Sequence, residues 1–113
     1  MEKDTKIYLI LAAIVIAIIL GIYWAKGNGS INEKTAKCMG ENSVLYTKLG
    51  CSACETQEKM FGDNYQYLNK IDCYFEIQKC IDAQITGTPT WIINGEKYLG
   101  VQSIEKLKEL TGC

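Results

Sequence analysis

Cys51 and Cys54 are the residues of this chain whose types and spacing point most directly to chemistry. They form a Cys-x-x-Cys motif that follows the apolar run at residues 44–49 and precedes a helix-like run at 55–61. This context predicts that Cys51 lies where a strand turns into a helix, and the unpaired N–H groups and positive dipole end of that helix favour a thiolate. A thiolate attacks disulfides, and Cys54 would then resolve the mixed disulfide. The motif therefore predicts thiol-disulfide exchange, while half of a zinc site or a structural bridge has the same pattern.

The composition excludes several other kinds of site. Histidine is absent, so the chain has no Ser-His-Asp or Cys-His arrangement and no metal site that needs imidazole. The 12 basic residues are all lysines, they are balanced by 13 acidic residues, and they form no basic block. Such a charge pattern gives no support for nucleic-acid binding. We expect no nucleic-acid partner, no bound metal and no diffusible cofactor, because a redox-active disulfide needs none.

The N-terminal part has the composition of a membrane segment. Residues 7–24 are almost wholly apolar and uncharged, and lysines flank them on both sides. About 18 to 20 such residues span a bilayer as a helix, and Tyr23 and Trp24 suit an interfacial aromatic belt. A cleavable signal peptide is the alternative, because small residues such as Ala25 follow the apolar run. We expect residues 1–26 to be a short cytoplasmic stub and a single transmembrane anchor in contact with membrane lipid.

The cysteines indicate the compartment of the remaining chain. All six lie beyond residue 37, a density that is typical of disulfide-bonded domains. Disulfides persist outside the cytosol. We therefore expect residues 27–37 to be a tether and the start of a short helix, and residues 38–113 to form an extracytoplasmic domain of a single-pass cell-membrane protein.

Residue patterning in the second part predicts a mixed α/β domain. The Asn94-Gly95 pair is a strong hairpin signal, and Ser103 and Gly112 are good start and stop residues for a last helix, which buries Ile104, Leu107 and Leu110. Residues 65–71 are ambiguous, with a helix as one interpretation. We expect helices at 31–39, at 55–61, after residue 75 and after residue 103. The first should end at Gly40, and the third should have the inward stripe Ile77, Cys80, Ile81 and Ile85. Strands are expected at 44–47, 72–75, 90–93 and 97–99. This order predicts a mixed sheet covered by helices.

Three runs carry a family resemblance: CETQEKMFG at residues 54–62, GTPTWIING at 87–95 and YLGVQS at 98–103. With the Cys-x-x-Cys motif at the active-site position and Thr88-Pro89 at the cis-proline position, residues 42–112 resemble a thioredoxin-fold domain. More narrowly, they resemble the thioredoxin-like domain associated with vitamin K epoxide reductase homologues. The resemblance implies an α/β, thioredoxin-like fold behind an N-terminal transmembrane helix.

The resemblance also implies a function. The chain would be a membrane-anchored thiol-disulfide oxidoreductase that exchanges disulfides with cysteine-containing secreted or membrane proteins. A membrane protein of the vitamin K epoxide reductase type would recycle it. In the resembling fold a cis Pro89 would lie against the cysteine pair, and the Thr88 backbone would bind an extended substrate strand.

Two departures from the thioredoxin pattern concern proton transfer. Gly50 stands where many thioredoxins have a tryptophan, and the buried acid of thioredoxin's central strand falls near Leu45. Proton transfer to Cys54 then needs another group, for which Glu58 and Lys59 are the nearby candidates. The alternative for both is an ordinary solvated helix face.

Spacing alone does not choose among the pairings of the other four cysteines. The family shows a structural bridge at positions comparable to Cys73 and Cys80, which leaves Cys38 with Cys113. That second bridge would close a loop of about 75 residues and add roughly 4 to 5 kcal/mol to the free energy of unfolding. The alternative role for either bridge is an electron relay to the active pair.

A non-catalytic anchored module is the competing interpretation of the whole chain. In it, all six cysteines would form structural bridges, or a zinc ion would be held by Cys51, Cys54, Cys73 and Cys80. The spacing of the last two is too wide for a usual zinc knuckle.

Overall fold

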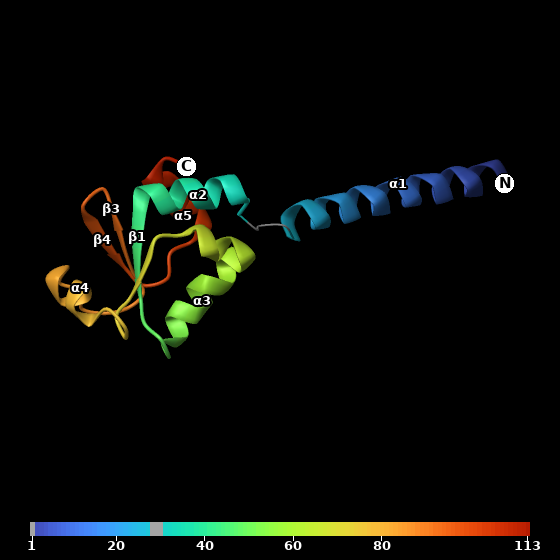
Figure 1. The fold of residues 1–113 in the computed structure, drawn as a ribbon. Coiled ribbons are helices and arrows are strands. Elements are labelled where there is room, and N and C mark those ends of the chain that lie inside the picture. The colour runs from blue at the N-terminus through green and yellow to red at the C-terminus, as the bar shows by residue number, and fades with distance from the viewer. Residues whose placement is uncertain (1, 28–30) are drawn as a thin grey trace. The chain divides into compact units, whose positions relative to one another are not determined.

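The structure, a computed structural model, describes residues 2–27 and 31–113. The chain divides into two compact units, Met1–Ser30 and Ile31–Cys113, each of which is described by itself (Figure 1). Most of the predicted tether, at 28–30, lies outside the described residues, as does Met1. The second unit begins at Ile31, earlier than the expected start at residue 38, because Ile31 and Ala36 are buried in its core.

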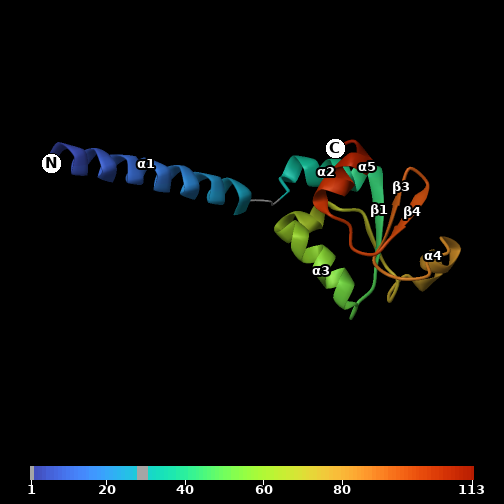
Figure 2. The ribbon, with the colours of Figure 1, turned by 180° about the vertical axis from the view of Figure 1, so that it is seen from behind.

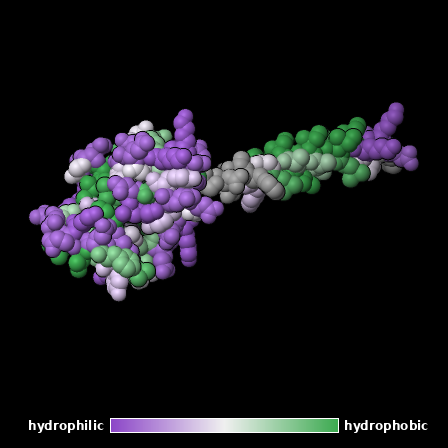
Figure 3. Space-filling model, in the orientation of Figure 1, coloured by the Kyte–Doolittle hydropathy of each residue, from purple (hydrophilic) through white to green (hydrophobic). Residues whose placement is uncertain are grey.

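The first unit contains one described helix, α1 (Glu2–Gly27). Its side chains from residue 2 to 23 are exposed, and the surface is apolar along most of its length with a hydrophilic N-terminal end (Figure 3). Within the described part of the chain, α1 is the helix long and apolar enough to cross a membrane, over Glu2–Tyr23 with a mean hydropathy of 2.6. A helix that is apolar on every side needs an apolar environment.

The second unit is built on a four-stranded sheet. Its strands are β1 (Ser43–Thr47), β2 (Lys70–Asp72), β3 (Thr90–Ile93) and β4 (Glu96–Leu99), in the order β2-β1-β3-β4. β2 is parallel to β1, whereas β3 runs antiparallel to both β1 and β4. The predicted hairpin joins β3 to β4, and both Asn94 and Gly95 have the positive φ that such a turn requires.

Alternation along the strands gives the sheet two buried faces. Leu45, Trp91 and Ile93 pack on one face against α2 (Glu33–Asn42), α3 (Ser52–Phe61) and α5 (Ile104–Thr111). On the other face, Tyr46 packs beneath α4 (Ile77–Asp82). α3 and α4 accordingly lie on opposite sides of β1 in both views (Figures 1 and 2). The predicted mixed sheet covered by helices is confirmed.

Two predicted elements near the second strand are shifted. The strand expected at 72–75 is instead β2, Lys70–Asp72. It is preceded by a 3₁₀ helix, η1 (Gly62–Tyr67), so the helical interpretation of residues 65–71 holds only as far as Tyr67. The chain turns after β2 because the Asp72 carboxylate accepts a hydrogen bond from the Tyr74 N–H at 2.8 Å. That contact favours a turn over further pairing.

The inward stripe predicted for the α4 region is right at Cys80 and at Ile85, which packs against the Tyr46 cluster, and wrong at Ile77 and Ile81. Cys80 is buried, but the side chains of Ile77 and Ile81 are 63% and 59% exposed. The Cys73–Cys80 disulfide centres the inner face of this short helix on residue 80. At about 100° per residue, both isoleucines then lie together on one flank of Cys80 and remain in solvent.

Gly40 does not end α2, which continues to Asn42. A Cβ at this position would collide with the backbone carbonyl of Tyr67. Gly40 therefore serves the close approach of α2 to η1, and its role in the sequence is packing rather than helix termination.

Candidate active site

Cys51 lies at the N-cap of α3, as the sequence predicted, and its side chain is half-buried. Its Sγ accepts a hydrogen bond from the Cys54 N–H at 3.2 Å, and its carbonyl accepts one from the Glu55 N–H at 3.1 Å. Gly50, with φ of +83°, makes the turn that leads into the cap. Cys54 is 5% exposed, one turn further into the helix. The two thiols thus differ in access: the first is partly exposed to solvent, and the second is buried behind it.

The Thr88-Pro89 loop contacts the Cys51 sulfur from a distant part of the sequence. The peptide bond between the two residues is cis. The Thr88 Oγ1 donates to Cys51 Sγ at 3.5 Å, and the thiol can in turn donate to the Thr88 carbonyl at 3.6 Å. The Gly100 N–H donates to the Pro89 carbonyl at 2.7 Å and holds the loop against the end of β4.

These contacts set the acidity of Cys51. Partial burial raises the pKa of the thiol, but hydrogen bonds with the Cys54 and Thr88 side chains and with backbone groups of Ala53 and Cys54 lower it, and the net shift is downward. Donors aimed at the sulfur stabilise its charged form. A lowered thiol pKa raises the fraction of thiolate, which is the nucleophile in disulfide exchange.

Behind the first cysteine, a cleft of about 470 Å³ reaches Cys54. Glu58, one of the two proton-transfer candidates, lines this cleft, whereas Lys59 is exposed and does not. Tyr65 and Lys70, from η1 and β2, complete its inner wall. Neither residue has a sequence signature for this site, because both come from segments whose position depends on the fold.

The groups of this cleft influence one another electrostatically. Burial raises the pKa of the Tyr65 hydroxyl, and the negative charges of Glu58, Cys54 and Asp72 raise it further, against a lowering hydrogen bond with Thr47. Burial lowers the pKa of the Lys70 ammonium, while the nearby Glu58 carboxylate raises it. The cleft therefore places ionisable groups around the buried thiol, where the sequence alone offered only a helix face.

The arrangement of the elements around the cysteine pair decides the fold. The Cys-x-x-Cys turn joins β1 to α3 and lies beside the Thr88-Pro89 loop. That loop leads into the antiparallel β3–β4 hairpin, and β2 pairs parallel to β1. The unit Ile31–Cys113 has the thioredoxin fold. The resemblance seen in the sequence is confirmed at this level.

The chain is similar to known proteins over part of its length. No protein-family model matches the chain. In an alignment 77 residues long, which covers 60% of this chain, it is 35% identical to thiol-disulfide oxidoreductase LTO1 of Arabidopsis thaliana. The match spans 20% of the length of that protein. Among solved structures, oxidised thioredoxin from Plasmodium falciparum is 21% identical and matches with a TM-score of 0.39, covering 73% of this chain and 90% of its own.

A buried amide holds the active-site helix of this thioredoxin-like unit in place. Gln57 of α3 is fully buried, and its Oε1 accepts hydrogen bonds from Trp91 Nε1 at 3.1 Å and from the Gln102 N–H at 2.7 Å. Its Nε2 donates to the Gln102 carbonyl at 3.0 Å. Sequence patterning missed Gln57, because an amide between charged helix residues is usually solvated.

The other four cysteines of the thioredoxin-like unit form two disulfides. Cys38 is joined to Cys113 across 75 positions, and Cys73 is joined to Cys80 across 7. This is the pairing that the family resemblance implied, and it leaves Cys51 and Cys54 as free thiols. A four-cysteine zinc site would need two cysteines that are here joined to each other.

Proposed function

We propose that this chain is a thiol-disulfide oxidoreductase in which Cys51 is the exchanging cysteine and Cys54 the resolving one. The observation that carries the proposal is the position of the Cys51 sulfur, which caps α3 and is contacted by the Thr88 hydroxyl. A sulfur held in this way is favoured as a thiolate. The identity with LTO1, named a thiol-disulfide oxidoreductase, supports the same chemistry.

In the reducing direction, the Cys51 thiolate attacks one sulfur of a substrate disulfide. A mixed disulfide forms, and the other substrate sulfur leaves as a thiolate that takes a proton. Cys54 then loses its proton and attacks the Cys51 sulfur, which releases the second substrate thiol and leaves a Cys51–Cys54 disulfide. Two electrons have passed to the substrate, and the oxidising direction is the reverse.

Glu58 is the stronger of the two candidates for accepting the Cys54 proton, because it lines the cleft that reaches this thiol and Lys59 does not. Stopped-flow measurement separates the two steps. Glu58→Gln should slow the resolution of a preformed mixed disulfide and leave the first attack by Cys51 nearly unchanged. Equal slowing of both steps would contradict the assignment.

The Thr88-Pro89 loop is proposed as the substrate contact, since the Thr88 carbonyl lies 3.6 Å from the reacting sulfur. A substrate segment whose cysteine has joined Cys51 must pass beside this backbone. Main-chain hydrogen bonds to Thr88 would hold it in an extended form.

We also propose that α1 anchors the protein in the cell membrane, with the thioredoxin-like unit on the extracytoplasmic side. The apolar length of α1 and the two structural disulfides support this arrangement. The substrates would be cysteine-containing secreted or membrane proteins. A membrane protein of the vitamin K epoxide reductase type would restore the redox state of the cysteine pair.

Trapping of mixed disulfides tests the proposal. Cys54→Ser, expressed in intact cells and quenched with a membrane-impermeant alkylating reagent, should accumulate adducts on a non-reducing gel, and Cys51→Ser should give none. Mass spectrometry of the adducts identifies the substrates and the recycling protein. If neither variant traps a partner and the wild-type pair resists mild reduction, the Cys-x-x-Cys is a structural bridge and the chain is a non-catalytic module.

A further inference from the structure

Exposed apolar side chains gather around the redox turn. Leu49 precedes the first active-site cysteine and is 60% exposed. Tyr74 and Phe75, in the turn after β2, are 62% and 71% exposed and pack edge to face with each other. Ile77 and Ile81 of α4 are exposed to a similar degree. We call these five residues the apolar rim. Clustered exposure of this kind is typical of a surface that binds a partner.

A groove of about 280 Å³ extends from part of the rim to Thr88, beside the reacting sulfur. Ile77 and Ile81 form one wall, and the Cys73–Cys80 disulfide lies along it. Thr88 lines the same groove and also contacts Cys51 Sγ. Any side chain that occupies the groove is therefore adjacent to the site of disulfide exchange.

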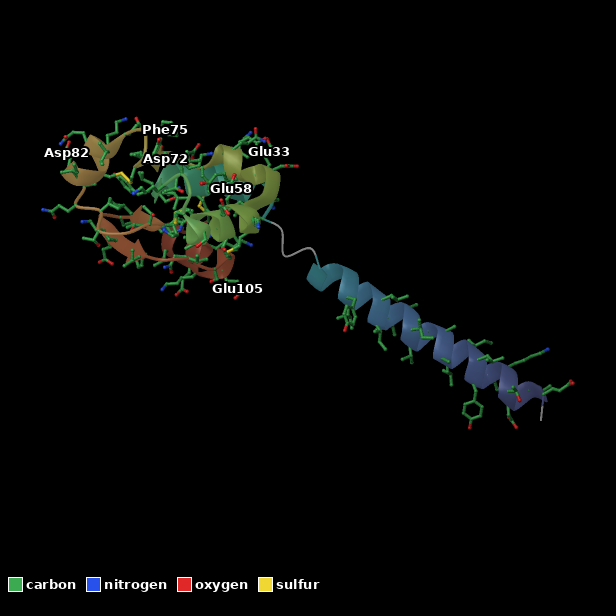
Figure 4. The ribbon with its side chains drawn as sticks, turned by 90° about the horizontal axis from the view of Figure 1, so that it is seen from below. Glu33, Glu58, Asp72, Phe75, Asp82 and Glu105 are labelled. Atoms are coloured by element: carbon green, nitrogen blue, oxygen red, sulfur yellow. A yellow bond between two sulfur atoms is a disulfide. The ribbon has the colours of Figure 1, made fainter. Side chains whose placement is uncertain are left out.

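The cleft behind Cys54, on the other side of Lys48, has a different character. It is lined by Phe75 of the rim and by more acidic than basic residues: Glu55, Glu58, Asp72 and Glu76 against Lys48 and Lys70. Figure 4 labels Glu58, Asp72 and Phe75, which come from α3, the end of β2 and the turn that follows.

Part of the charge in this cleft is already engaged. Lys70 Nζ donates to the Tyr65 carbonyl at 2.7 Å, and Glu76 pairs with Lys79 at 2.8 Å. Glu55 and Glu58, both exposed, form no ion pair within Ile31–Cys113, which the structure describes throughout. The cleft is therefore suited to a cationic side chain.

We propose that the groove and the cleft are the two halves of one docking surface for an extended polypeptide segment. This segment carries a bulky apolar residue on one side of its cysteine and a lysine or arginine on the other. This inference rests on the proposed function and specifies its substrate class. Lys48 lines both depressions and separates them, so a single segment joined to Cys51 reaches both. A membrane surface is the less suitable occupant, because exposed carboxylates repel anionic lipid and a groove accepts a side chain rather than a bilayer.

The experiment uses the reduced full-length chain in detergent and short peptides whose single cysteine is joined to glutathione. The first peptide has isoleucine and lysine as the two neighbours of the cysteine. A second replaces isoleucine by serine, and a third replaces lysine by glutamate. Each peptide is made with its two neighbouring residues in either order around the cysteine. In one of the two orders, the first peptide should be released about tenfold faster than the second or the third. A factor of this size is expected from burying one aliphatic side chain or pairing one charge.

Variants assign each preference to its half of the surface. Ile77→Ser/Ile81→Ser should bring the isoleucine-to-serine rate ratio close to one and keep the lysine preference. Glu55→Gln should lower the ratio of the lysine-peptide rate to the glutamate-peptide rate and keep the isoleucine preference. Gln78→Ser, at an exposed position of α4 that does not line the groove, is the matched control and should keep both ratios.

The outcomes separate this inference from the function on which it rests. Reduction of glutathione disulfide by the wild-type chain tests the exchange chemistry, and its absence would overturn the proposed function. If glutathione disulfide is reduced but all peptides react at one rate, the docking surface is wrong and the oxidoreductase stands. If the Ile77→Ser/Ile81→Ser chain reacts with all peptides like wild type, the groove does not select the apolar residue and the inference is overturned.

Discussion

At the scale of single residues, the chemistry depends on what surrounds one sulfur atom. The Cys54 N–H and the Thr88 hydroxyl both donate to Cys51 Sγ. The first donor comes with the helix cap, and any residue at position 54 other than proline would supply it. The second depends on the threonine side chain, so Thr88 is the residue through which substitution can tune the thiol.

Thr88→Val removes the hydroxyl donor and should raise the pKa of Cys51 toward the ordinary value for a thiol. Because the thiolate is the reactive form, the rate of alkylation by iodoacetamide rises with pH through this pKa. In a Cys54→Ser background, we expect the midpoint of that profile to move to higher pH. Thr86→Val, an exposed residue of the same loop, is the control and should leave the midpoint in place. An unchanged midpoint in the Thr88 variant would show that the helix cap alone lowers the pKa.

The residues with a motif signature could be identified from the sequence, and those without one could not. Cys51 and Cys54 form a motif whose spacing indicates their role, and the family resemblance implied the role of Thr88. Tyr65 and Lys70 have no such signature, because they reach the Cys54 cleft only after η1 and β2 have packed beside α3. Their contribution is a property of tertiary structure.

At the scale of elements, α3 must be held rigidly for its first turn to act as the cap of Cys51. Gln57 supplies this link, because its one amide group connects α3 to β3 through Trp91 and to the segment before α5 through Gln102. These polar groups are buried, so each depends on the amide for a partner.

Gln57→Leu should lower the free energy of unfolding by about 3 kcal/mol, since it leaves buried donors of Trp91 and Gln102 without an acceptor. Urea denaturation of the oxidised chain followed by tryptophan fluorescence measures the change. Gln66→Leu, at an exposed position of η1, is the matched control and should change it by less than about 0.5 kcal/mol. If the free energy of unfolding falls by a similar amount in both variants, the hydrogen bonds around Gln57 contribute little to stability.

Sequence patterns predicted the elements well where the signal is local, and less well where a tertiary contact decides. The β3–β4 hairpin and the Ser103 cap of α5 depend on neighbouring residues and have the predicted bounds to within a residue. The inward stripe of α4 was wrong at Ile77 and Ile81 because a disulfide, rather than apolar burial, orients this short helix. β2 ends early because the Asp72 side chain turns the chain.

At the scale of the whole molecule, the entry to the thioredoxin-like unit is joined to its exit. The Cys38–Cys113 disulfide connects α2 to the residue that follows α5. α2 and α5 also pack together through Met39 and Leu107, both fully buried. Because a domain of this size has a small core, a covalent closure of the chain is a large fraction of its stability.

The double variant Cys38→Ala/Cys113→Ala opens a loop that spans 75 positions. Loop closure of that length restricts the unfolded chain by about 4.5 kcal/mol at 25 °C, so the variant should lose a free energy of unfolding of this order. Urea denaturation of both chains with the Cys51–Cys54 pair kept oxidised measures the difference. Cys73→Ala/Cys80→Ala is the comparison, and its loop of 7 positions should contribute about 2 kcal/mol by the same relation. Equal losses in the two variants would contradict the loop-entropy explanation and would instead indicate that both bridges act through local packing.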